Sequence, residues 1–146
     1  MPTIEQSITI DRPRDEVFAF ATDPDKITLF NSNLVEYEQQ SEGARGKGTV
    51  DRGTVKVAGK KFDFTTEITE WQPGQRMTAR SLEAPMEWEL TQIFEDTGSG
   101  TEVTFHQEVP DLKGFFGKLG DAIVTKMYSR DVKSNLESLK ILLEEG

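Results

Sequence analysis

The sequence contains no cysteine and a single histidine, His106, among its 146 residues. Without thiols, the chain has no disulfide framework, no thiolate zinc site and no cysteine nucleophile. Acidic residues outnumber basic ones, because 26 Asp and Glu face 17 Lys and Arg, which gives a formal net charge of -9. Nucleic acid is therefore not an expected partner, since phosphate binding depends on clustered positive charge.

Long apolar runs are also missing. No segment approaches the roughly 20 apolar residues of a membrane-spanning helix, and the start of the chain lacks the basic and apolar regions of a secretory signal. We therefore expect a cytoplasmic protein without stable membrane insertion. The length is typical of one domain, so we expect a single ligand-binding domain over residues 1–146, present as a monomer or homodimer. The chain also lacks calcium-loop, phosphate-loop and dinucleotide spacings, which predicts no metal and no cofactor.

The order of hydrophobic patterns predicts an α+β fold. Thr3 to Ile10 alternate as in a half-buried strand, and two proline-led stretches, "DRPRDEVFAFATD" and "DPDKITLF", predict short helices. From Leu34 to Val109, about six runs rich in Val, Thr, Phe and Trp are separated by glycine and proline turns, which is typical of an antiparallel meander. A long helix then extends to Glu145 and is the only element large enough to cover the sheet.

Three glycines precede or begin this helix in "DLKGFFGKLG" (residues 111–120), where each would weaken a helix interior by about 0.5–1 kcal/mol. We hypothesise that residues 111–120 form a mobile flap, with Phe115 and Phe116 closing a cavity; the alternative is that the glycines allow close backbone packing. Further along, the apolar positions step by five between Met127 and Val132. This step indicates either a kink or a first half that buries a different surface from the second.

A curved sheet covered by one helix leaves a cavity, where small ligands bind. Strand alternation predicts which side chains face it. The inward set is mostly apolar and aromatic, and its predicted ligand-binding members are Val55, Phe62, Phe64, Thr66, Trp88, Leu90, Gln92, Phe105, Gln107, Phe116 and Met127. The polar members and Asp51 must pair with one another, reach water at strand ends, or wait for a ligand. Tyr37 and Tyr128 are candidate hydrogen-bond donors to a ligand carbonyl.

The element order and several stretches resemble the START-like (SRPBCC) superfamily, especially its polyketide cyclase/dehydrase-like branch. The resemblance covers the whole chain and rests on "ITIDRPRDEVFAFATDPDKITLF", "GKGT", "ITEWQPGQRM", "GSGTEVTF" and "NLESLKILLE". It implies a helix-grip fold, in which a curved seven-stranded antiparallel sheet wraps a long C-terminal helix around a hydrophobic cavity. It also implies a lipid, quinone or polyketide-like ligand. Asp51 departs from the pattern, since an apolar residue is expected there.

Two function classes remain open at this point. In the first, the protein binds a small hydrophobic or aromatic molecule. In the second, it is a cyclase/dehydrase-type enzyme in which Asp51 transfers protons. Against this, Asp51 is also interpretable as a structural carboxylate paired with Arg80 or Lys56. His106 alternates outward, which excludes a Ser/His/Asp arrangement in the cavity. A lipid handler that touches membranes through Phe115 and Phe116 is a third hypothesis, which the acidic charge disfavours.

Overall fold

The computed structural model describes residues 3–112 and 114–146. Its elements, in chain order, are β1 (Thr3–Ile10), α1 (Arg14–Ala21), α2 (Ile27–Phe30), β2 (Leu34–Gln39), β3 (Val50–Val57), β4 (Lys60–Gln72), β5 (Arg76–Glu83), β6 (Glu89–Asp96), β7 (Thr101–Glu108) and α3 (Asp121–Glu145). No helix within these residues is both long enough and apolar enough to cross a bilayer.

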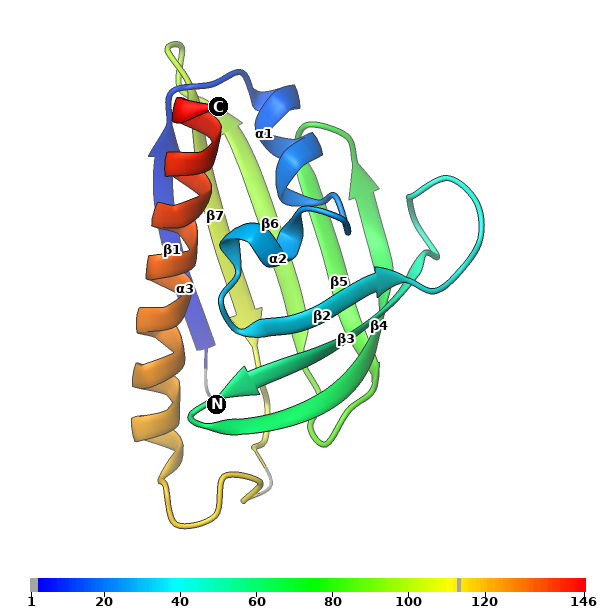
Figure 1. Ribbon diagram of the computed structural model, residues 1–146, viewed down its shortest axis with the longest axis vertical. Coiled ribbons are helices and arrows are strands. Elements are labelled where there is room, and N and C mark those ends of the chain that lie inside the picture. The colour runs from blue at the N-terminus through cyan, green and yellow to red at the C-terminus, as the bar shows by residue number, and fades with distance from the viewer. Residues whose placement is uncertain (1–2, 113) are drawn as a thin grey trace.

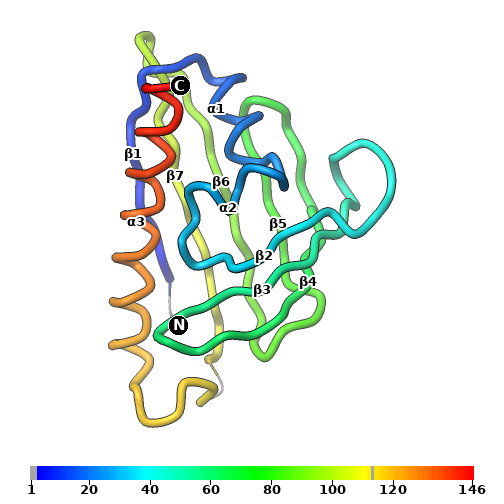
Figure 2. Tube along the Cα trace, in the orientation of Figure 1, coloured from blue at the N-terminus to red at the C-terminus, as the bar shows by residue number. Residues whose placement is uncertain are grey.

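The strands form one antiparallel sheet of seven strands in the order β1-β7-β6-β5-β4-β3-β2. Helices α1 and α2 carry the chain from one edge strand, β1, to the other, β2 (Figures 1 and 2). Register shifts in β4, between Thr65 and Thr66 and between Ile68 and Glu70, mark irregularities of the kind that bend a sheet. The sheet curls so that β2 and β3 lie across the open side while α3 runs along β1 (Figure 1). The predicted α+β helix-grip is confirmed.

The buried face of α3 differs from the predicted one in the first half of the helix. Val124, Tyr128 and Val132 face the sheet at steps of four, so Tyr128 is the inward residue that the apolar count had skipped. Met127 is instead 40% exposed and does not line the cavity. The predicted inward position of Met127 is therefore wrong. The apparent step of five arises because Tyr128, which has a polar hydroxyl, occupies the buried face and was not counted as apolar. The helix itself is continuous over Asp121–Glu145.

The glycines precede α3 and lie outside it. Gly114 and Gly117 adopt positive φ angles of 65° and 64°, which favour glycine because it lacks a Cβ. A Cβ at either position would meet no atom within 4 Å, so the close-packing alternative is wrong. Turns occupy residues 114–118, and Gly120 is the N-cap of α3. The hypothesised flap also includes Lys113, which lies outside the described residues.

We predict that the segment of residues 114–120 opens more readily than the body of α3. Most of its residues are exposed, whereas Leu136 is buried in the main core. Amide hydrogen exchange at Phe116 should therefore be at least about tenfold faster than at Leu136. Exchange measured by NMR on the free protein checks this. Comparable protection at the two amides would show that the segment is a fixed part of the cavity wall.

Candidate ligand-binding site

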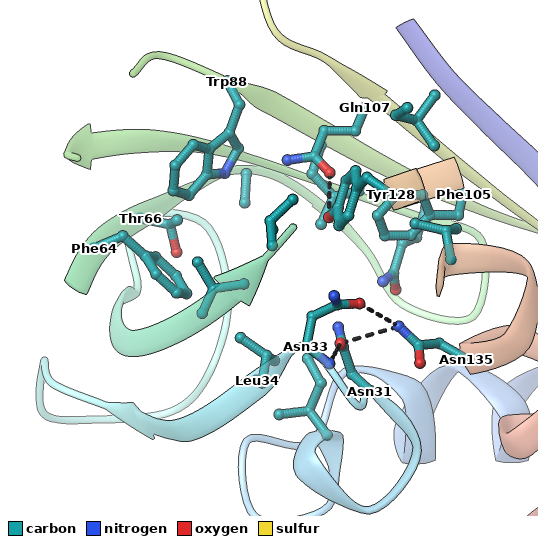
Figure 3. A pocket seen from close by; sticks show the side chains of 18 of the residues that line it. Asn31, Asn33, Leu34, Phe64, Thr66, Trp88, Phe105, Gln107, Tyr128 and Asn135 are labelled. Carbon is teal, nitrogen blue, oxygen red and sulfur yellow. Dashed lines mark hydrogen bonds between the residues drawn. The ribbon is translucent and has the colours of Figure 1, made fainter. Parts of the chain in front are cut away.

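A cavity of about 150 Å³ lies between the concave face of the sheet and α3 (Figure 3). The residues predicted to face it do so, with the exception of Met127. They are Asp51, Val55, Phe62, Phe64, Thr66, Trp88, Leu90, Gln92, Phe105, Gln107 and Phe116. The polar members are buried and do not reach bulk solvent at strand ends. Ligand contact by these side chains stays a prediction.

Aromatic side chains build one wall of the cavity. Phe64 and Trp88 meet edge to face with ring centroids 5.3 Å apart, and Phe62 packs on Phe115 at 5.1 Å. Across β3 and β4, Gly53 is paired with Phe64, and a Cβ on Gly53 would lie 2.8 Å from the Phe64 ring. The glycine therefore makes room for the ring, since real Cβ contacts are almost never that short.

Segment 114–120 joins this wall through two contacts. Phe116 lines the cavity, and its ring packs edge to face on Phe115 with centroids 5.1 Å apart. Lys60, at the start of β4, donates from Nζ to the Phe115 carbonyl at 2.7 Å and lies 4.1 Å from the centroid of its ring. The segment therefore rests on the β3–β4 hairpin, and its movement would enlarge the cavity on this side.

Asp51 is the most buried charged group of the cavity, at 1% exposure. Arg45 donates to both of its oxygens, from Nη1 to Oδ1 at 2.7 Å and from Nη2 to Oδ2 at 2.5 Å. Tyr37 donates its hydroxyl to Oδ2, also at 2.5 Å. The expected partners were Arg80 or Lys56, and this expectation is wrong. Arg80 pairs with Glu67 near the surface, while Arg45 reaches inward from the loop between β2 and β3.

This network ties the Asp51 carboxylate to two neighbouring side chains of the protein. Both oxygens already accept hydrogen bonds, and the guanidinium compensates the buried charge. Arg45 is in turn held by donation from Nε to the Thr22 carbonyl at 2.8 Å, which ties the loop to the end of α1. The arrangement fits a structural ion pair at the cavity wall.

Two further sets of hydrogen bonds join α3 to other elements around the cavity (Figure 3). Tyr128 donates its hydroxyl to Gln107 Oε1 at 2.7 Å. Asn135, 8% exposed, donates to Asn31 and Asn33, and its own Oδ1 accepts from the Ser32 backbone and hydroxyl. These bonds fix the segment between α2 and β2 against the helix.

Both tyrosines of the chain are predicted to stay protonated in alkaline solution. Burial raises the pKa of Tyr128, with a further contribution from Asp131. Burial also raises the pKa of Tyr37, with a further contribution from the Asp51 charge. Because folding favours the neutral phenols, this stabilisation is complete below the unfolded pKa of about 10 and is lost as pH rises further. Absorbance near 295 nm should show tyrosinate at about pH 11 only after unfolding; tyrosinate in the folded protein at that pH would contradict the network.

Sequence reasoning missed two residues of the site. Arg45 lies in the glycine-rich loop "SEGARGKG", where an arginine is ordinarily exposed, and no periodicity marks it. Asn135 could have been found, because it falls on the buried face of α3 between Val132 and Leu139. By contrast, His106 behaves as expected: it does not line the cavity, and its Nδ1 lies 2.9 Å from Glu5 Oε1 on the neighbouring strand β1.

The protein family described as "Polyketide cyclase / dehydrase and lipid transport" matches residues 1–144. The chain belongs to this family. The resemblance seen in the sequence is thereby confirmed, and membership of the polyketide cyclase/dehydrase and lipid transport family supports either hydrophobic ligand binding or a cyclase role. No functionally curated protein matches the chain in sequence.

Solved structures share the fold of this family member at low sequence identity. The TTHA0849 protein of Thermus thermophilus is 23% identical with a TM-score of 0.83, over 99% of this chain and all (100%) of that one. The Zhui aromatase/cyclase of Streptomyces sp. R1128 is 20% identical with a TM-score of 0.75, over 97% and 93% of the two chains. Ara h 8.0201 is 17% identical with a TM-score of 0.70, over 99% and 98%. At these identities the likeness shows the fold alone.

Proposed function

We propose that this protein binds a small hydrophobic molecule carrying an aromatic ring, in the cavity between the sheet and α3. The observation that carries the proposal is the cavity itself, which has a volume of about 150 Å³ and a mainly apolar and aromatic lining. A cavity of this kind forfeits packing interactions between side chains, so it persists where a ligand uses it or where the fold cannot close it. The family description, which includes lipid transport, supports the same conclusion.

The volume limits the ligand. An apolar protein cavity of about 150 Å³ accommodates benzene. The cavity therefore suits one ring, and a lipid tail, quinone or polyketide-like chain would require outward movement of Phe116 and its segment. This makes the opening of residues 114–120 part of the binding step for any larger ligand.

The cyclase alternative draws support from the family description and from the Zhui aromatase/cyclase, which has a similar fold. It would need a group in the cavity that takes and returns protons, and Asp51 is the candidate from the sequence. The hydrogen bonds from Arg45 and Tyr37 to both Asp51 oxygens favour a structural role for this carboxylate. The geometry therefore supports binding better than catalysis.

Native mass spectrometry of the protein purified from its own host tests the proposal. We expect a species heavier than the chain, which releases an aromatic or lipid-like molecule when the protein is denatured. A co-purified substrate that the protein converts on incubation would instead favour the enzyme. A protein that emerges empty and binds neither toluene nor phenol in calorimetry would overturn the proposed function.

A further inference from the structure

Gln92 is the one buried side chain among residues 3–112 and 114–146 with a fully enclosed polar atom, its Oε1, that has no hydrogen-bond partner. Gln92 lies in β6, lines the cavity and is 7% exposed. An unsatisfied buried acceptor costs about 1–3 kcal/mol, so a glutamine here is unfavourable for folding alone.

The surroundings of Gln92 offer it no partner in the sheet. Its cross-strand neighbours are Met77 on β5 and Phe105 on β7. Along β6, the residues that alternate to the same face are Leu90 and Phe94. All four are apolar, and Gln107, the diagonal neighbour on β7, uses its Oε1 to accept from Tyr128.

The side-chain oxygens of three other buried polar residues of the cavity, Asp51, Gln107 and Asn135, differ from Gln92 Oε1 in this respect. Gln107 accepts from Tyr128, Asp51 accepts from Arg45 and Tyr37, and Asn135 is engaged through both its oxygen and its nitrogen. These three side chains are thus anchored by hydrogen bonds within the protein. Gln92 Oε1 makes no such hydrogen bond, which indicates that its partner is a group of the ligand.

We infer that Gln92 is a specificity-determining residue. Rotation of its terminal amide about χ3 turns the enclosed Oε1 toward the cavity, where it accepts a hydrogen bond from a ligand hydroxyl, and the ligand class is therefore a hydroxylated aromatic ring. The inference rests on the proposed function and narrows it. A phenolic hydroxyl is a compact neutral donor, so it satisfies Oε1 without bringing an unpaired charge into an apolar cavity. A single hydroxylated ring also matches a volume of about 150 Å³.

Phenol and toluene form a matched pair of probes, because they differ by a hydroxyl in place of a methyl group. The affinity of each is measured by isothermal titration calorimetry for the wild type and for Gln92→Leu. We expect the ratio of phenol affinity to toluene affinity to fall at least about tenfold in Gln92→Leu, because the acceptor is lost while the shape is nearly kept. Comparing ratios cancels the different cost of removing each probe from water. The midpoint of thermal unfolding without ligand should rise, since the unsatisfied acceptor is gone.

Thr91→Val is the matched control. Thr91 adjoins Gln92 on β6, is 8% exposed, and points to the opposite face, where its hydroxyl lies 3.1 Å from that of Thr78. This variant should leave the phenol-to-toluene ratio unchanged. If Gln92→Leu does not fold, Gln92→Met provides an unbranched replacement for the same comparison.

The outcomes separate the inference from the proposed function. If both probes bind and the ratio is the same in the wild type and in Gln92→Leu, the inference is wrong while the proposed function stands. That result would also follow if a buried water held Gln92 permanently. If neither probe binds the wild type, the inference fails, and the proposed function fails with it if the protein is also purified empty.

Discussion

Replacing Arg45 with methionine is expected to lower the free energy of unfolding by about 3–5 kcal/mol, because it leaves the buried Asp51 carboxylate without its cation. Asp51 is 1% exposed, and the Arg45 side chain is 14% exposed, so solvent cannot replace the lost pair. Methionine keeps much of the apolar stem of arginine, which confines the change to the charge and its hydrogen bonds. Urea unfolding followed by circular dichroism measures the effect, and the thermal midpoint should fall by about 10 °C.

Arg80→Met provides the matched control for this prediction. Its pair with Glu67 is exposed, with side chains 57% and 31% accessible, and such pairs contribute about 0–1 kcal/mol. The double variant Arg45→Met/Asp51→Leu should recover most of the loss, since it removes the uncompensated charge. Equal destabilisation by Arg45→Met and Arg80→Met would show that Asp51 is solvated in the folded protein.

The double variant also separates the two function classes. If Asp51 is structural, the double variant should bind toluene with an affinity close to that of the wild type. If Asp51 transfers protons, a substrate identified by mass spectrometry should bind the double variant but no longer be converted. Asp51→Asn alone is a weaker test, because its amide would place a donor against the Arg45 guanidinium and destabilise the fold.

Ala79→Phe is expected to abolish binding of toluene, with at least about a hundredfold loss of affinity, because its ring fills the space that a benzene-sized ligand needs. Ala79 is 7% exposed, lines the cavity, and lies between Ile68 and Leu90 on the neighbouring strands. The added ring should cost about 1–3 kcal/mol of stability through overpacking, less than Arg45→Met costs. Calorimetric titration with toluene measures the binding.

Arg80→Phe is the control for this substitution. Arg80 is the next residue of β5 and points to the outer face, so the same new ring lies outside the cavity. Toluene should bind this variant as it binds the wild type. Retained binding in folded Ala79→Phe would place the site elsewhere on the molecule.

Most of the site residues predicted from the sequence follow from the alternation of side chains along the strands. In β3, β4, β6 and β7, one face of each strand is buried. A register shift of one residue would expose every apolar side chain, so the order of apolar and polar residues predicts which side chains point inward. Phe64, Leu90 and Gln107 are placed correctly on this basis. The same logic placed His106 on the outer face.

The errors in α3 have a different physical origin. A helix has several apolar positions per turn, and the choice between Met127 and Tyr128 depends on which one the sheet covers. Tyr128 faces inward because Gln107 accepts its hydroxyl, and Gln107 lies on β7, far away in the sequence. The spacing of apolar residues alone favoured Met127, because it does not count a tyrosine whose hydroxyl is hydrogen-bonded inside the protein.

The residue pattern was enough to predict the element order, the sheet, the inward faces of the strands and the family, because these follow from local periodicity and from stretches of matching residues. The partners of the polar groups became known from the folded arrangement alone. Arg45 reaches Asp51 from a loop without periodicity, and Gln92 is unsatisfied because its neighbours on β5 and β7 are apolar. Hydrogen bonds between distant segments depend on distances of a few tenths of an ångström, which no residue pattern along the chain specifies.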